Sequence, residues 1–349
     1  MRALRLNSWK SSPVLEEVPD PVPGPGQVVV KIGGAGACHS DLHLMHDLDE
    51  SVNPFWVPPF TLGHENAGWV HALGEGVSGL KIGDPVAVYG SWGCGHCTRC
   101  LAGMDTYCEN PLDQPVAGGG GGLGLDGGMA EYLRVPSARF CVPLPRGLDP
   151  IHAAPLTDAA LTPYHAVRRS LAKLQPGSHC VVIGVGGLGH MAVQILNAVC
   201  ATSVIAVDTR QSALATAASY GAAHTVLANG DAAEQIKDAT GGKGADVVLD
   251  FVGSDSTIAL GVAVSRFLGD LTIVGIAGGT LDLGFFTVPY ELSVQTIYWG
   301  SRPELVEVLN LASRGLITPK VTQFSLNDAA SAYLALAGGE LQGRAVIVP

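Results

Sequence analysis

The sequence predicts an α/β protein in which a β-rich N-terminal part precedes a doubly wound parallel sheet. Between about residues 151 and 287, short apolar runs alternate with helical stretches, and the runs cover 181–183, 204–207, 247–250 and 271–274. This alternation is typical of parallel strands joined by helices. The first 150 residues are rich in Pro and Gly and in short β-like runs such as 28–32 and 69–73. The length of 349 residues therefore indicates two domains.

The turn 184–189, which reads Gly-Val-Gly-Gly-Leu-Gly, is the first element that indicates a ligand. It follows the run 181–183 and precedes an apolar-periodic helical segment, 191–199. Glycines in this order allow a tight turn and let the backbone approach a pyrophosphate at the helix N-terminus. We therefore expect a Rossmann-type dinucleotide site whose turn residues are Gly184, Gly186, Gly187, Leu188 and Gly189.

Asp208 follows the next β run, 204–207. A carboxylate at this place accepts hydrogen bonds from the adenosine ribose and repels a 2′-phosphate. The sequence therefore predicts NAD rather than NADP as the cofactor. Arg210, two residues on, is the feature that would soften this preference.

Four cysteines, Cys94, Cys97, Cys100 and Cys108, have the spacing of a structural zinc site. Four thiolates around one zinc ion leave no coordination position for a substrate, so we expect this site to stabilise a loop. The alternatives are free or disulfide-bonded cysteines. Spacings this short favour zinc over both.

A second group of metal-ligand residues consists of Cys38, His64 and Asp158. One thiolate, one imidazole and one carboxylate would leave the fourth zinc position open for water or an alcohol oxygen, as in catalytic zinc sites. Taken singly, Cys38 and His64 are more typical of buried core residues. Their combination with the glycine turn and the cysteine cluster is what indicates a catalytic metal.

The composition indicates a cytoplasmic protein. The sequence has no run of about 18 apolar residues that would predict a membrane span, and no secretory signal is visible. Cys141, Cys180 and Cys200, which lie outside the predicted zinc sites, are odd in number, so a disulfide framework is not expected. The net charge of −11 argues against binding to nucleic acid.

With these motifs in this order, the chain resembles the zinc-dependent alcohol dehydrogenases of the medium-chain dehydrogenase/reductase superfamily over nearly all of its length. The segments 21–31, 38–41 and 63–65 carry the resemblance together with the cysteine cluster and the glycine turn. The segments 88–94 and 156–158 are similar to those of bacterial NAD-dependent members that act on secondary alcohols.

The resemblance implies a discontinuous architecture. Residues 1–150 and 288–349 would form a GroES-like, partly open β-barrel catalytic domain, and residues 151–287 the Rossmann domain. The alternative is a zinc-free relative, such as a quinone reductase or a lens-type structural protein. Such a relative would keep the glycine turn but lack Cys38, His64 and the cysteine cluster, so metal content separates the two.

Asp158 departs from the family pattern, because many members have a second cysteine ligand there. A carboxylate keeps the formal charge of the site but is a harder ligand than a thiolate. Glu65, next to His64, is an alternative or exchanging ligand.

The resemblance also implies a reaction, in which hydride passes between an alcohol, secondary or aromatic, and NAD to give a ketone or aldehyde. The site would lie in the cleft between the domains. Zinc would activate the alcohol, and Ser40 and His43 would carry its proton toward solvent. Asp41 would orient His64, and Arg344 would meet the pyrophosphate.

We further expect two zinc ions per chain, one catalytic and one structural, and a small-molecule alcohol or ketone as the substrate. The segment 294–302 resembles the strand that family members pair across a two-fold axis, which implies a homodimer or homotetramer. Candidates for apolar walls of the substrate site are Trp56, Trp92, Phe285, Phe286 and Trp299.

Overall fold

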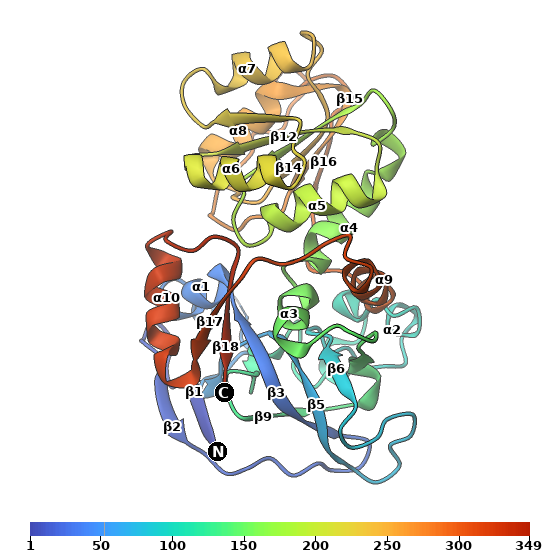
Figure 1. Ribbon diagram of the computed structural model, residues 1–349, viewed down its shortest axis with the longest axis vertical. Coiled ribbons are helices and arrows are strands. Elements are labelled where there is room, and N and C mark those ends of the chain that lie inside the picture. The colour runs from blue at the N-terminus through green and yellow to red at the C-terminus, as the bar shows by residue number, and fades with distance from the viewer. Residues whose placement is uncertain (52) are drawn as a thin grey trace. The chain divides into compact units, whose positions relative to one another are not determined.

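A computed structural model describes residues 1–51 and 53–349, which form two compact units (Figure 1). Unit 1 comprises Met1–Leu161, Trp299–Arg314 and Pro319–Pro349, and unit 2 comprises Thr162–Tyr298 and Gly315–Thr318. Unit 1 is thus discontinuous in sequence, but the chain changes units after Leu161 and Tyr298 rather than after the expected 150 and 287. The reason is local: α3 (Pro150–Ala153) contacts strands of unit 1, and β16 (Ser293–Thr296) pairs with the sheet of unit 2.

Unit 1 is built on a seven-stranded sheet. Its strands run β10-β6-β5-β3-β18-β17, and β9 also pairs with β3. Their bounds are β3 (Val28–Ala37), β5 (Glu65–Leu73), β6 (Pro85–Val88), β9 (Tyr132–Val135), β10 (Cys141–Pro143), β17 (Val321–Ser325) and β18 (Arg344–Val348). A three-stranded sheet contains β1 (Arg2–Leu6), β2 (Val14–Glu17) and β4 (Phe60–Thr61), and a small ladder joins β7 (Gly120–Gly121) to β8 (Gly124–Leu125).

The register of the long sheet gathers distant residues at one end of β3. Both β5 and β18 pair antiparallel with β3, so that Gly36 lies opposite Glu65 and Ala37 opposite Ala345. The start of β5 and the start of β18 therefore meet the end of β3, just before Cys38. The helices of unit 1 are α1 (His39–His46), α2 (Thr98–Leu101), α3, α9 (Arg302–Ser313) and α10 (Ala329–Ala337).

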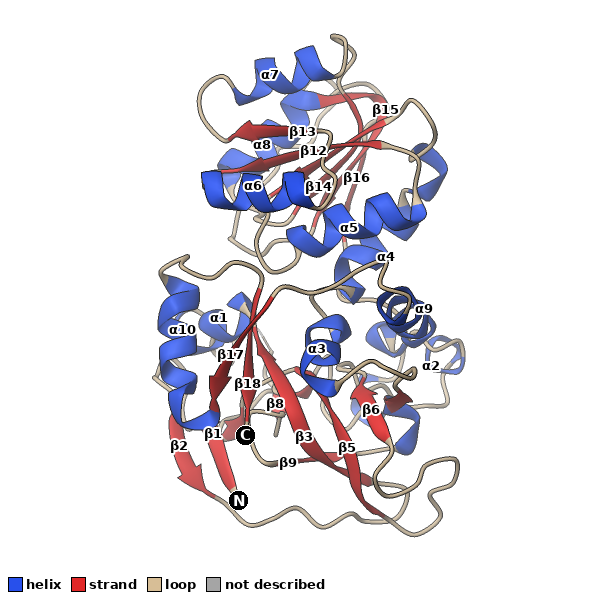
Figure 2. Cartoon of the chain, viewed as in Figure 1, coloured by secondary structure: helices blue, strands red, loops and turns tan. Residues whose placement is uncertain are grey.

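Unit 2 is a six-stranded parallel sheet in the order β13-β12-β11-β14-β15-β16, flanked by helices (Figure 2). The strands are β11 (His179–Ile183), β12 (Ser203–Asp208), β13 (His224–Leu227), β14 (Ala245–Asp250), β15 (Ser265–Ile273) and β16. The helices are α4 (Leu161–Arg169), α5 (Gly189–Val199), α6 (Gln211–Ser219), α7 (Ala232–Ala239) and α8 (Asp255–Val264). The first residue of α4, Leu161, is the last residue of the first segment of unit 1. The predicted doubly wound sheet is confirmed, and its order reverses at β11, where dinucleotides bind in such folds.

The core of unit 2 explains why these runs are strands. Val181, Ile205, Val248 and Leu271 from four neighbouring strands are each 0% exposed. Strands buried on both faces read as continuous apolar runs, and each such side chain contributes roughly 1.5–3 kcal/mol. The apolar runs did not indicate β13 or β16, because both lie at the edges of the sheet and carry fewer buried residues. A strand near β16 was expected only from the resemblance of the segment 294–302.

The glycine run 118–122 has the composition of a flexible surface loop, but most of it is buried in the structure. Gly120 is buried, and a Cβ built on it would lie 1.9 Å from the carbonyl oxygen of Gly90. Gly122 has a φ of +82°, a conformation that glycine adopts without strain. The glycines therefore permit close backbone packing. Among the described residues, no helix is both long and apolar enough to span a membrane.

Candidate active site

The predicted catalytic ligands come together in unit 1. Cys38 follows β3, His64 precedes β5 and Asp158 follows a short 3₁₀ turn, Ala154–Thr157. One ligand atom from each of these residues and from Glu65 lies within 4.8 Å of all the others. The structure thus brings together the three residues that sequence analysis proposed as ligands and the fourth that it proposed as an alternative.

The distances in this cluster fit a tetrahedral zinc ion. Cys38 Sγ lies 3.9 Å from Asp158 Oδ2, and His64 Nε2 lies 3.8 Å from the same oxygen. Ligand bonds of about 2.0–2.3 Å at tetrahedral angles require separations of about 3.4–3.6 Å between such atoms. The donor set is one soft sulfur, one nitrogen and one oxygen, and all three are typical zinc ligands.

His64 is oriented by Asp41. Its Nδ1 lies 3.1 Å from Asp41 Oδ1, whereas its Nε2 faces Asp158. The Nδ1–Oδ1 pair is close but not aligned as a hydrogen bond, and both atoms are buried without another partner. Burial lowers the pKa of His64, but the charge of Asp41 and its neighbours outweighs burial and raises it overall. Asp41 thus stabilises the imidazole with Nε2 directed at the ligand cluster, as second partners of metal-binding histidines do.

Glu65 and Arg344 form a buried ion pair beside these ligands. Arg344 is 1% exposed and donates from Nε to Glu65 Oε2 at 2.9 Å and from Nη2 to Oε1. Arg344 Nη2 also lies 3.3 Å from Cys38 Sγ. Burial raises the pKa of Glu65 to about 7 against the opposing charge of Arg344. A Cβ at Gly36 would lie 1.9 Å from Glu65 Oε2, so glycine is required there.

The two residues of the expected proton path both lie on α1. Ser40 Oγ is 3.2 Å from His64 Nε2, and the ring Nδ1 of His43 is 2.6 Å from Asp47 Oδ2. Residues three apart on a helix share a face, so Ser40 and His43 point the same way. The His43 side chain is 27% exposed, which leaves it open to exchange protons with water.

Trp299, a candidate for an apolar wall of the substrate site, also contacts the ligand cluster. Its φ is +59°, its Nε1 donates to the Thr157 carbonyl at 2.8 Å, and its ring meets His64 edge to face with centroids 5.7 Å apart. Thr157 immediately precedes Asp158, so Trp299 contacts two ligand segments at once. Of the other wall candidates, Phe285 and Phe286 are 76% and 87% exposed in unit 2.

The four-cysteine cluster has the dimensions of a zinc cage. Cys94 and Cys100 sulfurs are 3.9 Å apart, and those of Cys97 and Cys108 are 4.0 Å apart, against about 3.8 Å for tetrahedral zinc–sulfur geometry. The amide of Glu109, followed by that of Cys100, lowers the pKa of Cys97 to about 6, which favours the thiolate. All eight cysteines are free, so the disulfide alternative is excluded in this structure.

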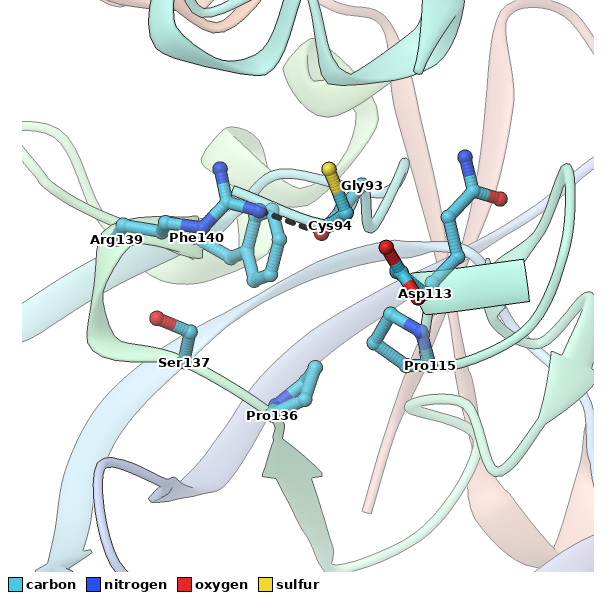
Figure 3. Close-up of a pocket in the computed structure, with 9 residues that line it drawn as sticks. Gly93, Cys94, Asp113, Pro115, Pro136, Ser137, Arg139 and Phe140 are labelled. Atoms are coloured by element: carbon cyan, nitrogen blue, oxygen red, sulfur yellow. Dashed lines mark hydrogen bonds between the residues drawn. The ribbon is translucent and has the colours of Figure 1, made fainter. Parts of the chain in front are cut away.

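A pocket of about 320 Å³ lies beside this cage (Figure 3). Arg139 lines it and donates from Nη2 to the Gly93 carbonyl at 2.6 Å. Its other lining residues include Pro136, Ser137 and Asp113. The pocket contains none of the predicted catalytic residues.

The glycine turn of unit 2 has space where a pyrophosphate would lie. A Cβ on Gly186 would meet nothing within 4 Å, whereas one on Gly189 would lie 1.8 Å from the Gly184 carbonyl. Asp208 ends β12 and its Oδ2 accepts from the Val185 amide at 2.8 Å. Its Oδ1 lies 3.3 Å from Nε of Arg210. The acidic residue thus sits at the turn, and the nearby arginine is paired with it.

Two supporting residues were not found from the sequence. Gly36 reads as an ordinary strand glycine, and Tyr333 lies in an alanine-rich helix 292 residues from its partner Asp41. No local signal could have found either, because each acts through a contact that only the register of the sheet or the packing of α10 creates.

Taken together, a β-rich unit with two zinc-type ligand clusters and a parallel sheet with a glycine turn define a zinc-binding dehydrogenase. Family models match both units: the alcohol dehydrogenase GroES-like domain covers residues 24–146, and the zinc-binding dehydrogenase model covers residues 187–314. The chain belongs to this zinc-binding alcohol dehydrogenase family and is an enzyme. The predictions of fold class, family and enzyme class are confirmed.

Individual relatives are similar to this chain over its full length. The NAD-dependent alcohol dehydrogenase of Sulfurisphaera tokodaii is 36% identical over 365 residues, and 100% of both chains is covered. The D-arabinose 1-dehydrogenase (NADP(+)) of Saccharolobus solfataricus is 33% identical, with 100% of this chain and 97% of that one covered. The crystal structure of the alcohol dehydrogenase of Aeropyrum pernix matches with a TM-score of 0.92 and 36% identity over 100% of both chains.

Proposed function

We propose that this enzyme transfers hydride reversibly between a small alcohol, secondary or aromatic, and NAD, giving a ketone or aldehyde. The observation that carries the proposal is the ligand set Cys38, His64 and Asp158, which offers three zinc ligands of a catalytic type within one buried cluster. A second zinc belongs to the four-cysteine cage, where it has a structural role. This gives two zinc ions per chain.

The zinc ion supplies Lewis acidity toward the alcohol oxygen, and NAD supplies the hydride acceptor. Residues of the chain would position these groups and transfer the proton of the substrate hydroxyl. Ser40 Oγ, beside His64, would accept the proton that the substrate hydroxyl loses while it releases its own proton toward His43. His43, partly exposed and held by Asp47, exchanges a proton with solvent.

The cofactor preference follows from Asp208, whose carboxylate favours ribose hydroxyls over a 2′-phosphate. Arg344 is proposed to meet the pyrophosphate. Its guanidinium is buried against Glu65 and Cys38, which opposes such a contact.

We also propose a homodimer or homotetramer in the cytoplasm. β16 lies at the edge of the unit 2 sheet, where its outer backbone groups can pair with a second copy. Cys141, Cys180 and Cys200, which lie outside the proposed zinc sites, are odd in number, and this supports a reducing compartment.

The test of the ligand set is Asp158→Ala against Asp158→Cys, with zinc per chain and turnover of an alcohol panel with NAD and NADP. Alanine should remove one of two zinc ions and nearly all turnover, because it leaves two ligands. Cysteine restores the donor count, so it should keep the metal, with a pH optimum shifted upward because a softer thiolate weakens the Lewis acid. An alanine variant with both zinc ions and normal turnover would assign the third ligand to Glu65.

A further inference from the structure

We propose that Tyr333 is a positioning residue for the catalytic metal, acting through Asp41 on His64. The proposal rests on the ligand set proposed above. Tyr333 lies in α10, which contacts α1 (Figure 1), and is 4% exposed. Its hydroxyl oxygen is 2.9 Å from Asp41 Oδ2. Asp41 is fully buried in the first turn of α1, so water cannot replace this contact.

The proton of the Tyr333 hydroxyl goes to Asp41. The hydroxyl has two acceptors within reach, because Met129 Sδ also lies 3.0 Å away. A phenol has a single proton, and a carboxylate is a much stronger acceptor than a thioether sulfur. Met129 therefore provides packing, and Asp41 receives the hydrogen bond.

This bond determines which oxygen of Asp41 faces the histidine. Oδ2 accepts from Tyr333 and from the amide of Cys38 at 3.0 Å, and Oδ1 lies 3.1 Å from His64 Nδ1. Two donors on one oxygen hold the carboxylate group in one orientation. The other oxygen then lies close to Nδ1, where its negative charge favours the proton on Nδ1 and leaves Nε2 for the metal.

Loss of the hydroxyl leaves Asp41 with the Cys38 amide as its one described donor on Oδ2. The carboxylate can then rotate away from Nδ1, and the imidazole loses the partner that fixes its tautomer and ring orientation. The effect should appear as weaker binding of the catalytic zinc, since partners of ligating histidines are worth about 10- to 100-fold in metal affinity.

The experiment compares Tyr333→Phe with a matched control, Tyr89→Phe. Tyr89 is also fully buried in unit 1, and its hydroxyl contacts the Gly300 carbonyl and Thr106 rather than Asp41. Zinc affinity at the catalytic site is measured by competition with a chelator, on protein whose four-cysteine site stays loaded. Tyr333→Phe should raise the Kd for this zinc about tenfold, and Tyr89→Phe should leave it unchanged.

A second arm repeats Tyr333→Phe in an Asp41→Ala background, where it should have no further effect on the Kd. Equal zinc affinities in wild type and Tyr333→Phe, or an equal loss of zinc affinity in Tyr89→Phe, would overturn the positioning role of Tyr333. Neither result would overturn the proposed ligand set. A further loss in the Asp41→Ala background would overturn the route through Asp41. Wild-type protein that binds zinc only at the four cysteines would overturn the proposed ligand set as well.

Discussion

Replacing Arg344 with methionine should strongly destabilise unit 1. The change keeps an apolar side chain of similar length but removes the guanidinium that pairs with Glu65. The two side chains are 1% and 0% exposed, and Arg344 contacts both carboxylate oxygens. Breaking a buried pair by removing one partner costs about 3–5 kcal/mol, because the remaining charge is buried without compensation.

The assay is urea unfolding followed by tryptophan fluorescence, with zinc saturating and at constant concentration. All five tryptophans lie in unit 1, so the signal reports on this unit alone. The double variant Glu65→Gln, Arg344→Met should recover more than half of the loss, because no uncompensated charge remains. A loss below about 1 kcal/mol for Arg344→Met would refute the argument that Arg344 compensates the Glu65 charge.

The loss of stability caused by Arg344→Met should also depend on pH. The pKa of Glu65 is raised to about 7 in the folded protein from an ordinary value near 4.5, mainly by burial. The folded state therefore binds the proton more tightly than the unfolded state, and the contribution of Glu65 to stability falls as pH rises from 4.5 to 7. Without Arg344 this pKa rises further, so Arg344→Met should be less damaging at pH 5.5 than at pH 8. A loss that grows at low pH would contradict this reasoning.

Two further predictions concern the zinc cage and the cofactor site. Cys100→Ser should release the structural zinc and lower the midpoint of thermal unfolding, because a structural site contributes its binding energy to folding; an unchanged midpoint with one zinc lost would contradict it. Asp208→Gly should raise the NADP to NAD ratio of kcat/KM by at least about tenfold, because it removes both the ribose partner and the carboxylate that pairs with Arg210. An unchanged ratio would make Arg210 the next residue to test.

The sequence predicts the ligands and the glycine turn because each is encoded locally. Cys38, His64 and the four cysteines stand in short motifs, and the turn 184–189 is bounded by a strand and a helix that apolar patterns reveal. The contacts that support these ligands join residues that are far apart in the sequence. Arg344 reaches Cys38 across 306 residues, and this contact depends on the register of β18 on β3.

The compact units of the structure begin and end at other residues than the predicted domains, for a related physical reason. The apolar pattern that predicts strands is weak in β16, whose residues are half-buried or exposed. Its place in the sheet of unit 2 depends on pairing with β15, which composition does not report. The glycine run 118–122 cannot be interpreted from composition either, because glycines are common both in flexible loops and where two backbone segments pack closely. Here the contact of Gly120 with the Gly90 carbonyl shows that the glycines permit close packing.

The ion pair between Glu65 and Arg344 also has a consequence for biosynthesis. The two residues are separated by 279 positions, so at roughly 5–20 residues per second the ribosome makes Glu65 about 14–56 s before its partner. During this interval β5 carries a carboxylate that has no counterion, and burying it is unfavourable. We therefore expect burial of Glu65 at the start of β5 to be unfavourable until Arg344 is available to pair with it. For the same reason, we expect the catalytic centre to become stable only after β18, which carries Arg344, has been made and has docked on β3.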